Sequence, residues 1–179
     1  ISVSRLFSDG MVLQQNTDAA IWGKADPGTR VSVTASWNGK TYRCEADKEG
    51  RWILEMKTPQ AGYSAYVITV KGGGTTLTIK DVLIGEVWLA SGQSNMEMPM
   101  RGFFNCPVEN AAEYICAPAA TEKVRMFTVP VSQSYEPLDE VNGKWAGAGP
   151  STIAEMSATA YFFARKLNQM LDVPVGILS

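Results

Sequence analysis

The stretch GEVWLASGQSNMEMPM, Gly85 to Met100, decides how this sequence is interpreted. It continues an apolar run, Val82–Ala90, that is typical of a β-strand covered on both faces. The run ends in a small polar turn with Ser94 at its centre, and helix-forming residues follow. Gly92 is expected to let the backbone turn sharply. Backbone N–H groups after such a serine can stabilise an oxyanion, so the pattern indicates a hydrolytic nucleophile.

Two observations weigh against that interpretation. A serine hydroxyl is a poor nucleophile until a base removes its proton, and the 179 residues include no histidine. Met96 also stands where the G-x-S-x-G nucleophile elbow has its second glycine. Serine at a strand–helix junction is a common helix N-cap, so Ser94 as a cap is the alternative. Gln93 and Asn95 carry amides that either hold this loop or bind substrate.

Composition excludes several classes of function. The chain is 45% hydrophobic and 19% charged with a net charge of −2, which is ordinary for a folded soluble protein. Its Lys and Arg residues are scattered, so we expect no nucleic-acid partner. No apolar run approaches the roughly 18–20 residues that a membrane span needs. No group of residues has metal-ligand spacing and no glycine-rich loop resembles a phosphate site, so we expect no metal and no cofactor.

Residues 1–80 alternate apolar and polar side chains over short segments, the pattern of β-strands. The predicted strands are Ala20–Gly23, Arg30–Trp37, Lys40–Ala46, Arg51–Met56, Ala65–Lys71 and Thr75–Lys80. Turn residues separate them, and Asn38-Gly39 predicts a tight hairpin because both residues tolerate positive φ. The spacing predicts a small antiparallel β-sandwich domain over residues 1–80.

The pattern changes after Lys80 to β-α-β-α-β, which predicts a parallel sheet with helices outside it over residues 81–179. The predicted strands are Val82–Ala90, Val124–Pro130 and Val173–Leu178; the helices are Val108–Ala117 and Thr152–Leu171; and Val131–Pro150 is a loop. An apolar face on the second helix is predicted from its three- and four-residue spacing: Met156, Ala160, Phe163, Leu167 and Met170. Ligands of such sheets bind at the carboxyl ends of the strands.

The three cysteines are predicted to be free and mostly buried: Cys44, Cys106 and Cys116. If residues 108–116 are helical, the last two lie ~12–15 Å apart. A disulfide requires Cα atoms within about 7 Å, so no bridge is expected between them.

Several other side chains have both a structural and a binding interpretation. Trp88, inside the apolar run, is expected in the core. Trp145, in a predicted loop, is either packed or a platform for a sugar ring. Arg101 is either a solvated surface residue or a partner for an anionic substrate. Trp22, Trp37 and Trp52 are expected to pack within strands.

The longer motif around Ser94 resembles the serine-bearing block of the sialate O-acetylesterase family, which are SGNH-type carbohydrate esterases. Other blocks resemble the same family in the same order. They are LFSDGMVLQQ (Leu6–Gln15), AAIWGKADPGTRVSV (Ala19–Val33), VRMFTVP (Val124–Pro130), KWAGAGPSTIAEMSATAYFFARKL (Lys144–Leu167) and VPVGILS (Val173–Ser179). The resemblance therefore covers almost the whole chain. It implies that residues 81–179 form the first part of a three-layer α/β/α SGNH-like domain.

The resemblance also implies an activity, with Ser94 as the nucleophile and its own N–H as an oxyanion donor. The substrate would be an O-acetylated sugar or sialic acid, and an acetylxylan-type esterase shares the same serine block. The family's glycine, asparagine and Asp-His pair lie in later blocks that do not match any part of this chain. We therefore expect either an N-terminal fragment or a site that a second chain completes, and little activity from the chain alone.

Two further expectations follow from the sequence as given. It begins with Ile1 rather than Met, which suits a mature or engineered product whose signal peptide has been removed. A secreted or periplasmic protein is therefore expected. A non-catalytic carbohydrate-binding or assembly module is the alternative from a different class of function, because the β-rich half and the missing base would permit it.

Overall fold

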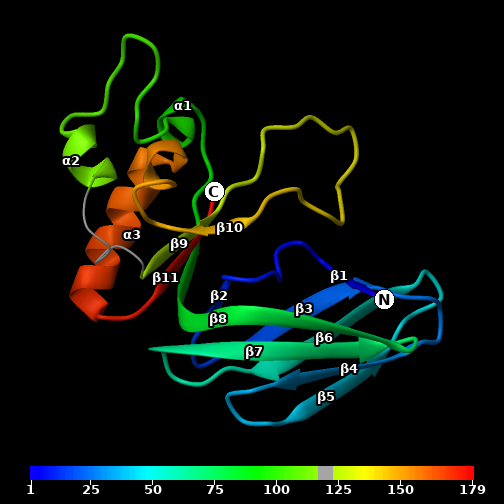
Figure 1. The fold of residues 1–179 in the computed structure, drawn as a ribbon. Coiled ribbons are helices and arrows are strands. Elements are labelled where there is room, and N and C mark those ends of the chain that lie inside the picture. The colour runs from blue at the N-terminus through cyan, green and yellow to red at the C-terminus, as the bar shows by residue number, and fades with distance from the viewer. Residues whose placement is uncertain (117–122) are drawn as a thin grey trace.

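The computed structural model describes residues 1–116 and 123–179, and its architecture is mixed α/β with many strands and few helices (Figure 1). The first strands are β1 (Ser2–Val3), β2 (Val12–Gln14), β3 (Asp18–Lys24), β4 (Arg30–Ala35), β5 (Thr41–Glu45), β6 (Arg51–Lys57), β7 (Gly62–Gly72) and β8 (Thr75–Leu89). The remaining elements are α1 (Ser94–Glu97), α2 (Ala111–Ile115), β9 (Val124–Phe127), β10 (Trp145–Gly147), η2 (Ile153–Glu155), α3 (Ala158–Leu171) and β11 (Val175–Leu178).

The N-terminal unit contains a three-stranded antiparallel sheet in the order β1-β3-β6, and strands β5, β4, β7 and β8 that pair antiparallel in that order. Strand β6 alternates buried and exposed residues along its whole length, as the period-two pattern predicts. Its inward side chains join those of the second group in one core, which includes Ile21, Trp52, Val33 and Ile68. The six segments predicted as strands are all strands, while the short β1 and β2 were not predicted.

The hairpin predicted at Asn38-Gly39 is wider than a two-residue turn. Strands β4 and β5 are joined by residues 36–40, and only Gly39 of the predicted pair has positive φ, at +64°. The Asn38 side chain instead accepts a hydrogen bond from the Lys40 N–H at 2.8 Å. Asn38 therefore stabilises the turn through its side chain rather than through a left-handed backbone.

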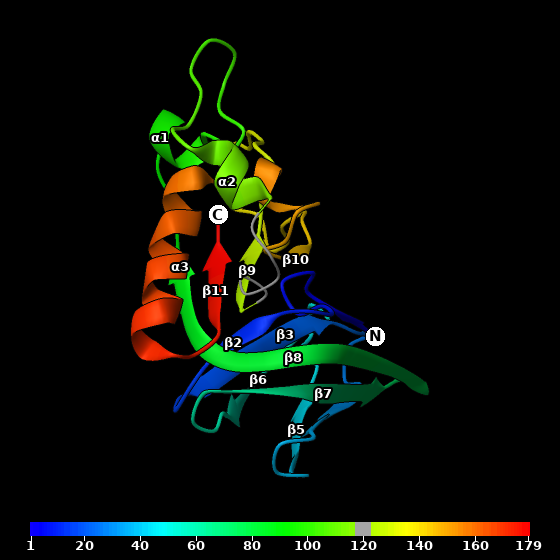
Figure 2. The ribbon, with the colours of Figure 1, turned by 60° about the vertical axis from the view of Figure 1, so that its left-hand side comes forward.

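Strand β8 links the two units, and the predicted strands Thr75–Lys80 and Val82–Ala90 are parts of it. It pairs with β7 as far as Ile84 and then with β11 from Glu86 to Leu89, so one strand serves both units. Asp81 has φ of +55°, which marks an irregularity in the middle of the strand. Figure 2 shows β8 curving from the lower sheet up toward α3.

The C-terminal unit has the strand order β10-β9-β11-β8, in which β11 pairs parallel with both of its neighbours. Between β8 and β11 strands and helices alternate broadly as predicted, but the short helix α1 and the antiparallel strand β10 are additional elements, and helix α3 packs against β11 and β9. The core under α3 is formed by Tyr161, Ala164, Met126 and Ile177 together with their neighbours. Helix α2 lies on the same side, because the rings of Tyr114 and Phe162 are 4.7 Å apart.

Both predicted helices are shorter than expected. Only Ala111–Ile115 of the first is α-helical, and Ala117 lies outside the described residues. The second is interrupted at Met156, whose ψ of 146° is extended, because residues around it pair with the segment that follows α1. Ser157 then caps α3, since its hydroxyl accepts a hydrogen bond from the Ala160 N–H at 3.3 Å.

The predicted apolar face of α3 is partly wrong. Phe163 and Met170 are 44% and 69% exposed, whereas Tyr161 and Ala164 are fully buried. The buried face of the helix is therefore centred on Ala160, Tyr161 and Ala164, and Phe163 and Met170 lie at its edge. Spacing alone does not distinguish these two neighbouring faces.

The segment predicted as a loop, residues 131–150, contains strand β10, which pairs antiparallel with β9. Trp145 lies on this strand and is half-buried, and its indole N–H donates to the Leu6 carbonyl at 2.8 Å. Its ring also contacts Phe127 at 5.8 Å. Trp145 is therefore a packing residue between the two units, and this contradicts its assignment to a loop.

Trp88 is 45% exposed rather than buried, so the prediction of a strand covered on both faces is wrong beyond Gly85. From Glu86 to Leu89, β8 has a described partner strand on one side only, and the neighbouring Leu89 is 76% exposed. Trp88 instead packs edge-to-face on Phe163 at 5.2 Å. Trp52 is buried and Trp22 and Trp37 are half-buried, as expected for packing residues.

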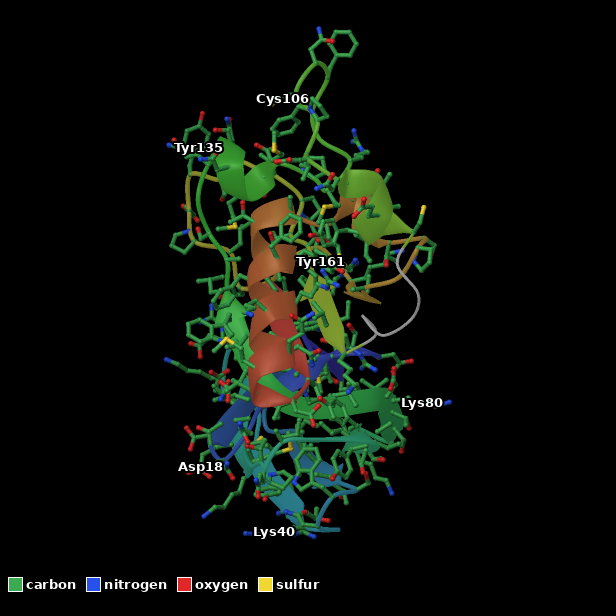
Figure 3. All side chains as sticks on the ribbon, turned by 90° about the vertical axis from the view of Figure 1, so that its left-hand side faces the viewer. Asp18, Lys40, Lys80, Cys106, Tyr135 and Tyr161 are labelled. Atoms are coloured by element: carbon green, nitrogen blue, oxygen red, sulfur yellow. The ribbon has the colours of Figure 1, made fainter. Side chains whose placement is uncertain are left out.

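The three cysteines are free, as predicted, but they are not mostly buried. Cys106 and Cys116 are exposed and Cys44 is of intermediate exposure. Figure 3 shows Cys106 on a loop that projects from the molecule at the end opposite Lys40. The burial prediction failed because exposure depends on where a loop lies in three dimensions.

Within the described residues, no helix combines the length and the apolar composition that crossing a membrane requires.

Candidate functional site

Three strands of the C-terminal unit end at the same edge of the sheet, and a cavity of about 450 Å³ lies there. Residues just after each strand line it, namely Ser91 after β8, Thr128 after β9 and Ser179 after β11. The start of the α3 region contributes Glu155 and Ser157. This is the position in which open α/β sheets bind ligands, as the strand order predicts.

Ser94 is the first residue of the one-turn helix α1 and is exposed to solvent. The N-cap of this helix is Gln93, and no side chain caps it, so Ser94 does not serve as a cap. In the part of the chain that the structure describes, the N–H groups of Ser94 and Asn95 donate no hydrogen bond. Unpartnered donors of this kind are expected in the first turn of a helix.

Gly92 allows a close approach to Met96 and does not adopt an unusual backbone angle. A Cβ atom at this position would lie 3.1 Å from the Cβ of Met96, and the residue is not among those with positive φ. The turn therefore folds back tightly on α1 because residue 92 has no side chain. The expectation that Gly92 supplies unusual backbone freedom is therefore not met, and its lack of a side chain matters only for the contact with Met96.

The serine loop is fixed to the beginning of α3. The Asn95 carbonyl accepts a hydrogen bond from the Thr159 hydroxyl at 3.0 Å. The Met98 carbonyl accepts one from the Ala158 N–H at 2.9 Å, and the Met100 N–H donates to the Met156 carbonyl at 2.8 Å. These bonds hold α1 and the residues that follow it against the start of the half-buried helix α3, which fixes the position of the serine loop.

The strand that leads to Ser94 is fixed from the other side by the N-terminal unit. The half-buried Glu86 carboxylate accepts hydrogen bonds from the side-chain amides of Gln14 at 3.1 Å and Gln15 at 2.7 Å. The Gln14 side chain also accepts one from the Val87 N–H at 2.8 Å, which extends the β2–β8 pairing by one step. The segment Leu13–Gln15 thus stabilises the part of β8 just before the serine loop.

The structure brings Gln93, Ser94 and Asn95 together on one exposed turn beside the cavity, but these three residues are not among those that line it. Glu97 of α1 and Glu155 of η2 do line it. Arg101 is not free, because its Nε donates to Glu155 Oε1 at 2.7 Å. Arg101 is therefore a solvent-exposed residue, as one of the two interpretations expected, and it also has a protein partner.

Sequence reasoning did not single out Thr128, Glu155 or Ser157, although all three line the cavity. The ends of β9 and β11 were predictable positions, because carboxyl ends of parallel strands share an edge. Ser157 also had a signal, since it precedes the apolar segment ATAYFFA as an N-cap does. Nothing in the sequence indicated that Glu155 would lie next to Arg101.

The chemistry of this site is that of an exposed hydroxyl without a base. The sequence has no histidine, and the Ser94 hydroxyl has no hydrogen-bond partner in residues 1–116 and 123–179. The same residues hold no group of three or more His, Cys, Asp or Glu side chains suited to a metal ion. The described residues therefore offer an accessible serine and free backbone donors, but no group placed to activate it.

Comparison with known proteins links the chain to one group of enzymes, although no family model matches it. It is 34% identical over 185 residues to the mouse protein named sialate O-acetylesterase, covering 94% of this chain and 33% of that protein. It is 30% identical over 188 residues to the human protein of the same name, covering 96% of the chain and 35% of that protein. The chain thus spans about a third of the length of these curated relatives.

A solved structure is similar over nearly the whole chain. It is that of a carbohydrate acetylesterase from Xanthomonas citri, with a TM-score of 0.89 and 35% sequence identity. The match covers 99% of this chain and 39% of the other. Both the sequence and the mixed α/β fold therefore place this chain with the same relatives that the motif around Ser94 resembles.

Proposed function

We propose that this chain, a homologue of the sialate O-acetylesterases over nearly its whole length, is the serine-bearing part of a carbohydrate O-acetylesterase. The observation that carries the proposal is the position of GQSNM, which follows a strand that ends beside the cavity. The fold proposed is an antiparallel β-sandwich followed by the first part of an SGNH-like α/β domain. The match to a carbohydrate acetylesterase structure supports this arrangement.

In the proposed reaction the Ser94 hydroxyl oxygen attacks the carbonyl carbon of an acetyl ester on a sugar. The C–O bond to the sugar then breaks, the sugar alcohol leaves with a proton, and the acetyl group stays on Ser94. Water hydrolyses this acetyl-enzyme and restores the serine. The N–H groups of Ser94 and Asn95 are free to interact with the oxyanion that forms in both steps.

The base for this reaction must come from outside the sequence given, because it contains no histidine. A further part of the same polypeptide or a second chain would supply it, together with the family's later glycine, asparagine and aspartate. The proposal therefore includes the inactivity of this polypeptide by itself. Without a base, a serine hydrolase loses several orders of magnitude in turnover.

The proposed substrate is an O-acetylated sugar, and the names of the curated relatives favour sialic acids. An acetylated polysaccharide such as acetylxylan is the second candidate within the same chemistry. A secreted or periplasmic location remains part of the proposal. The absence of histidine favours one other candidate, a non-catalytic carbohydrate-binding or assembly module.

The test compares acetate release from a chromogenic acetate ester and from acetylated glycans by a longer parent polypeptide and by this chain. The parent is expected to turn over, and Ser94→Ala to lower kcat by on the order of 10³-fold or more. Ser64→Ala is the matched control, because Ser64 is an exposed serine of β7 that does not line this cavity, and it is expected to retain most of the activity.

The chain of residues 1–179 alone is expected to release no acetate above the rate of its own Ser94→Ala variant. Robust turnover by this chain that depends on Ser94 would contradict the need for an added base. A parent enzyme that is unaffected by Ser94→Ala would contradict the role of the serine. Glycan binding without turnover in the parent would favour the non-catalytic module.

A further inference from the structure

A second cavity, of about 280 Å³, lies on the N-terminal unit. Its floor is formed by strands β3 and β6 of the three-stranded sheet, and one wall by Asp139 and Glu140 of the segment between β9 and β10. The cavity shares no lining residue with the one beside the serine loop. This second cavity is therefore separate from the site proposed for ester hydrolysis.

The floor is apolar and faces outward. Trp22 and Ile53 are register partners across β3 and β6, while the residues next to them in sequence, Ile21 and Trp52, point into the core. Ile53 is 63% exposed. The Trp22 ring is held at 90° to Phe7 with the centroids 4.5 Å apart, which fixes the indole in place. A fixed aromatic ring beside an exposed branched side chain is a preformed apolar platform.

The rim is polar and carries both signs of charge. Lys24 and Arg51 are the next register pair along the same face, and Arg51 Nη2 lies 3.1 Å from Asp139 Oδ2. Among the described residues, the Lys24 ammonium and the Glu140 carboxylate have no hydrogen-bond or ion-pair partner. These two groups are available to a ligand that carries both donors and acceptors.

We propose that this cavity binds one ring of a neutral oligosaccharide. The C–H face of a sugar ring would lie on Trp22 and Ile53, and its hydroxyl groups would bond with Lys24 and Glu140. The lining holds two cationic residues, Lys24 and Arg51, and three carboxylates, Asp47, Asp139 and Glu140. This excess of negative charge favours a neutral sugar over one that bears a carboxylate.

The segment between β9 and β10 connects this cavity with the serine end of the molecule. Thr128 and Pro130 line the cavity beside the serine loop, and Asp139 and Glu140, farther along the same segment, line the one over β3 and β6. A glycan held at the second cavity is thus held by a segment that also borders the candidate site. This inference rests on the proposed carbohydrate substrate, but binding at the second cavity does not depend on hydrolysis of an ester.

The test titrates this chain with cellohexaose as the neutral probe and sialyllactose as the anionic probe, followed by tryptophan fluorescence and calorimetry. Cellohexaose is expected to saturate the fluorescence change, and Ile53→Glu to weaken its binding at least about tenfold, since the apolar floor is lost. Val67→Glu is the matched control, because Val67 is an exposed apolar strand residue outside the cavity, and it is expected to leave binding unchanged.

A second variant keeps the test decisive if Ile53→Glu fails to fold. Glu140→Lys reverses the excess charge of the rim and is expected to weaken cellohexaose binding and strengthen sialyllactose binding. Ser94→Ala is expected to leave the affinity for both probes unchanged. A failure of the proposed esterase function can therefore be distinguished from a failure of this inference. Absence of saturable cellohexaose binding, tighter binding of sialyllactose by the unmodified chain, or equal affinities in all variants would overturn the inference.

Discussion

Trp52 in the N-terminal unit and Trp88 in the C-terminal unit both lie on strands rich in apolar residues, yet they are 2% and 45% exposed. Trp52 faces a core to which several strands contribute, and its N–H donates to the Ser2 carbonyl at 3.2 Å. Trp88 lies where β8 has a described neighbour on one side only. The comparison teaches that burial follows the neighbours of a strand, and composition alone does not determine it.

The largest expected effect on stability comes from replacing the two tryptophans that are compared above. Trp52→Ala removes a fully buried ring and is expected to cost about 3–5 kcal/mol of unfolding free energy. Trp88→Ala removes a half-exposed ring whose main partner is Phe163, so a loss below about 1.5 kcal/mol is expected. Urea unfolding of both variants measures the difference, and equal losses would break the comparison.

The second prediction concerns the contact between the units. Arg125 of β9 donates to the carbonyls of Gly10 at 2.9 Å and Asp81 at 2.6 Å and to the Asp81 carboxylate, and its side chain is 12% exposed. Arg125→Met leaves these acceptors without this donor, and the unfolding free energy is expected to fall by about 2–4 kcal/mol.

Arg101→Met is the matched control for that experiment. The side chains of Arg101 and Glu155 are 56% and 69% exposed. Loss of their ion pair is therefore expected to lower the unfolding free energy by less than about 1 kcal/mol. Thermal or urea unfolding of the two variants is the measurement. Similar destabilisation by both would show that Arg125 does not hold the units together.

The third prediction is a gain of stability in the C-terminal unit. The Tyr161 hydroxyl is buried without a hydrogen-bond partner in the described part of the chain. Tyr161→Phe removes this group while keeping the ring, so the unfolding free energy is expected to rise by up to about 1 kcal/mol. A loss of stability after this substitution would show that the hydroxyl has a partner in solution.

Tyr161 is also expected to make the unfolding free energy depend on pH. Burial raises the pKa of the Tyr161 phenol above its ordinary value of 10.0. The folded state therefore resists ionisation, so the unfolding free energy is unaffected by this group below pH 10 and falls as the pH rises above it, where the phenol ionises in the unfolded chain first. Tyr161→Phe is expected to flatten this decline, as measured by urea unfolding between pH 9 and 11.5.

The smallest effect is on thiol reactivity and leaves the fold intact. Cys106 and Cys116 are exposed and are expected to react quickly with a disulfide reagent. Burial raises the pKa of the Cys44 thiol, which reduces its reactive thiolate, so Cys44 is expected to react more slowly. Counting released thiolate over time distinguishes the fast pair from the slow third thiol, and three equal rates would contradict the exposures.

Much of the fold was predictable where local signals coincide. Strand β6 alternates at every position, and the parallel order of β8, β9 and β11 follows from the β-α-β-α-β pattern. The failures lie where a tertiary contact decides. The predicted helix from Thr152 breaks at Met156 because this segment pairs with residues near Met100, which are distant in sequence.

For the candidate site, the sequence predicted the turn that carries Gln93, Ser94 and Asn95, because the apolar run ends there in small and polar residues. It did not predict that Glu86 would be held by Gln14 and Gln15. Those residues are about seventy positions apart, and no periodicity relates them. Only the register of β2 against β8 brings the three side chains together.

The amino-acid sequence by itself determined the β-rich first half, the parallel order of the second, the serine turn and the absence of a histidine base. These features depend on alternation, on turn chemistry and on which residue types are present, all of which are local. Only the tertiary structure decided that Trp88 is half-exposed, that Arg101 pairs with Glu155, and that an apolar platform at Trp22 and Ile53 faces solvent. These depend on the neighbours that distant segments supply, and pairing over such distances leaves no periodic trace in the chain.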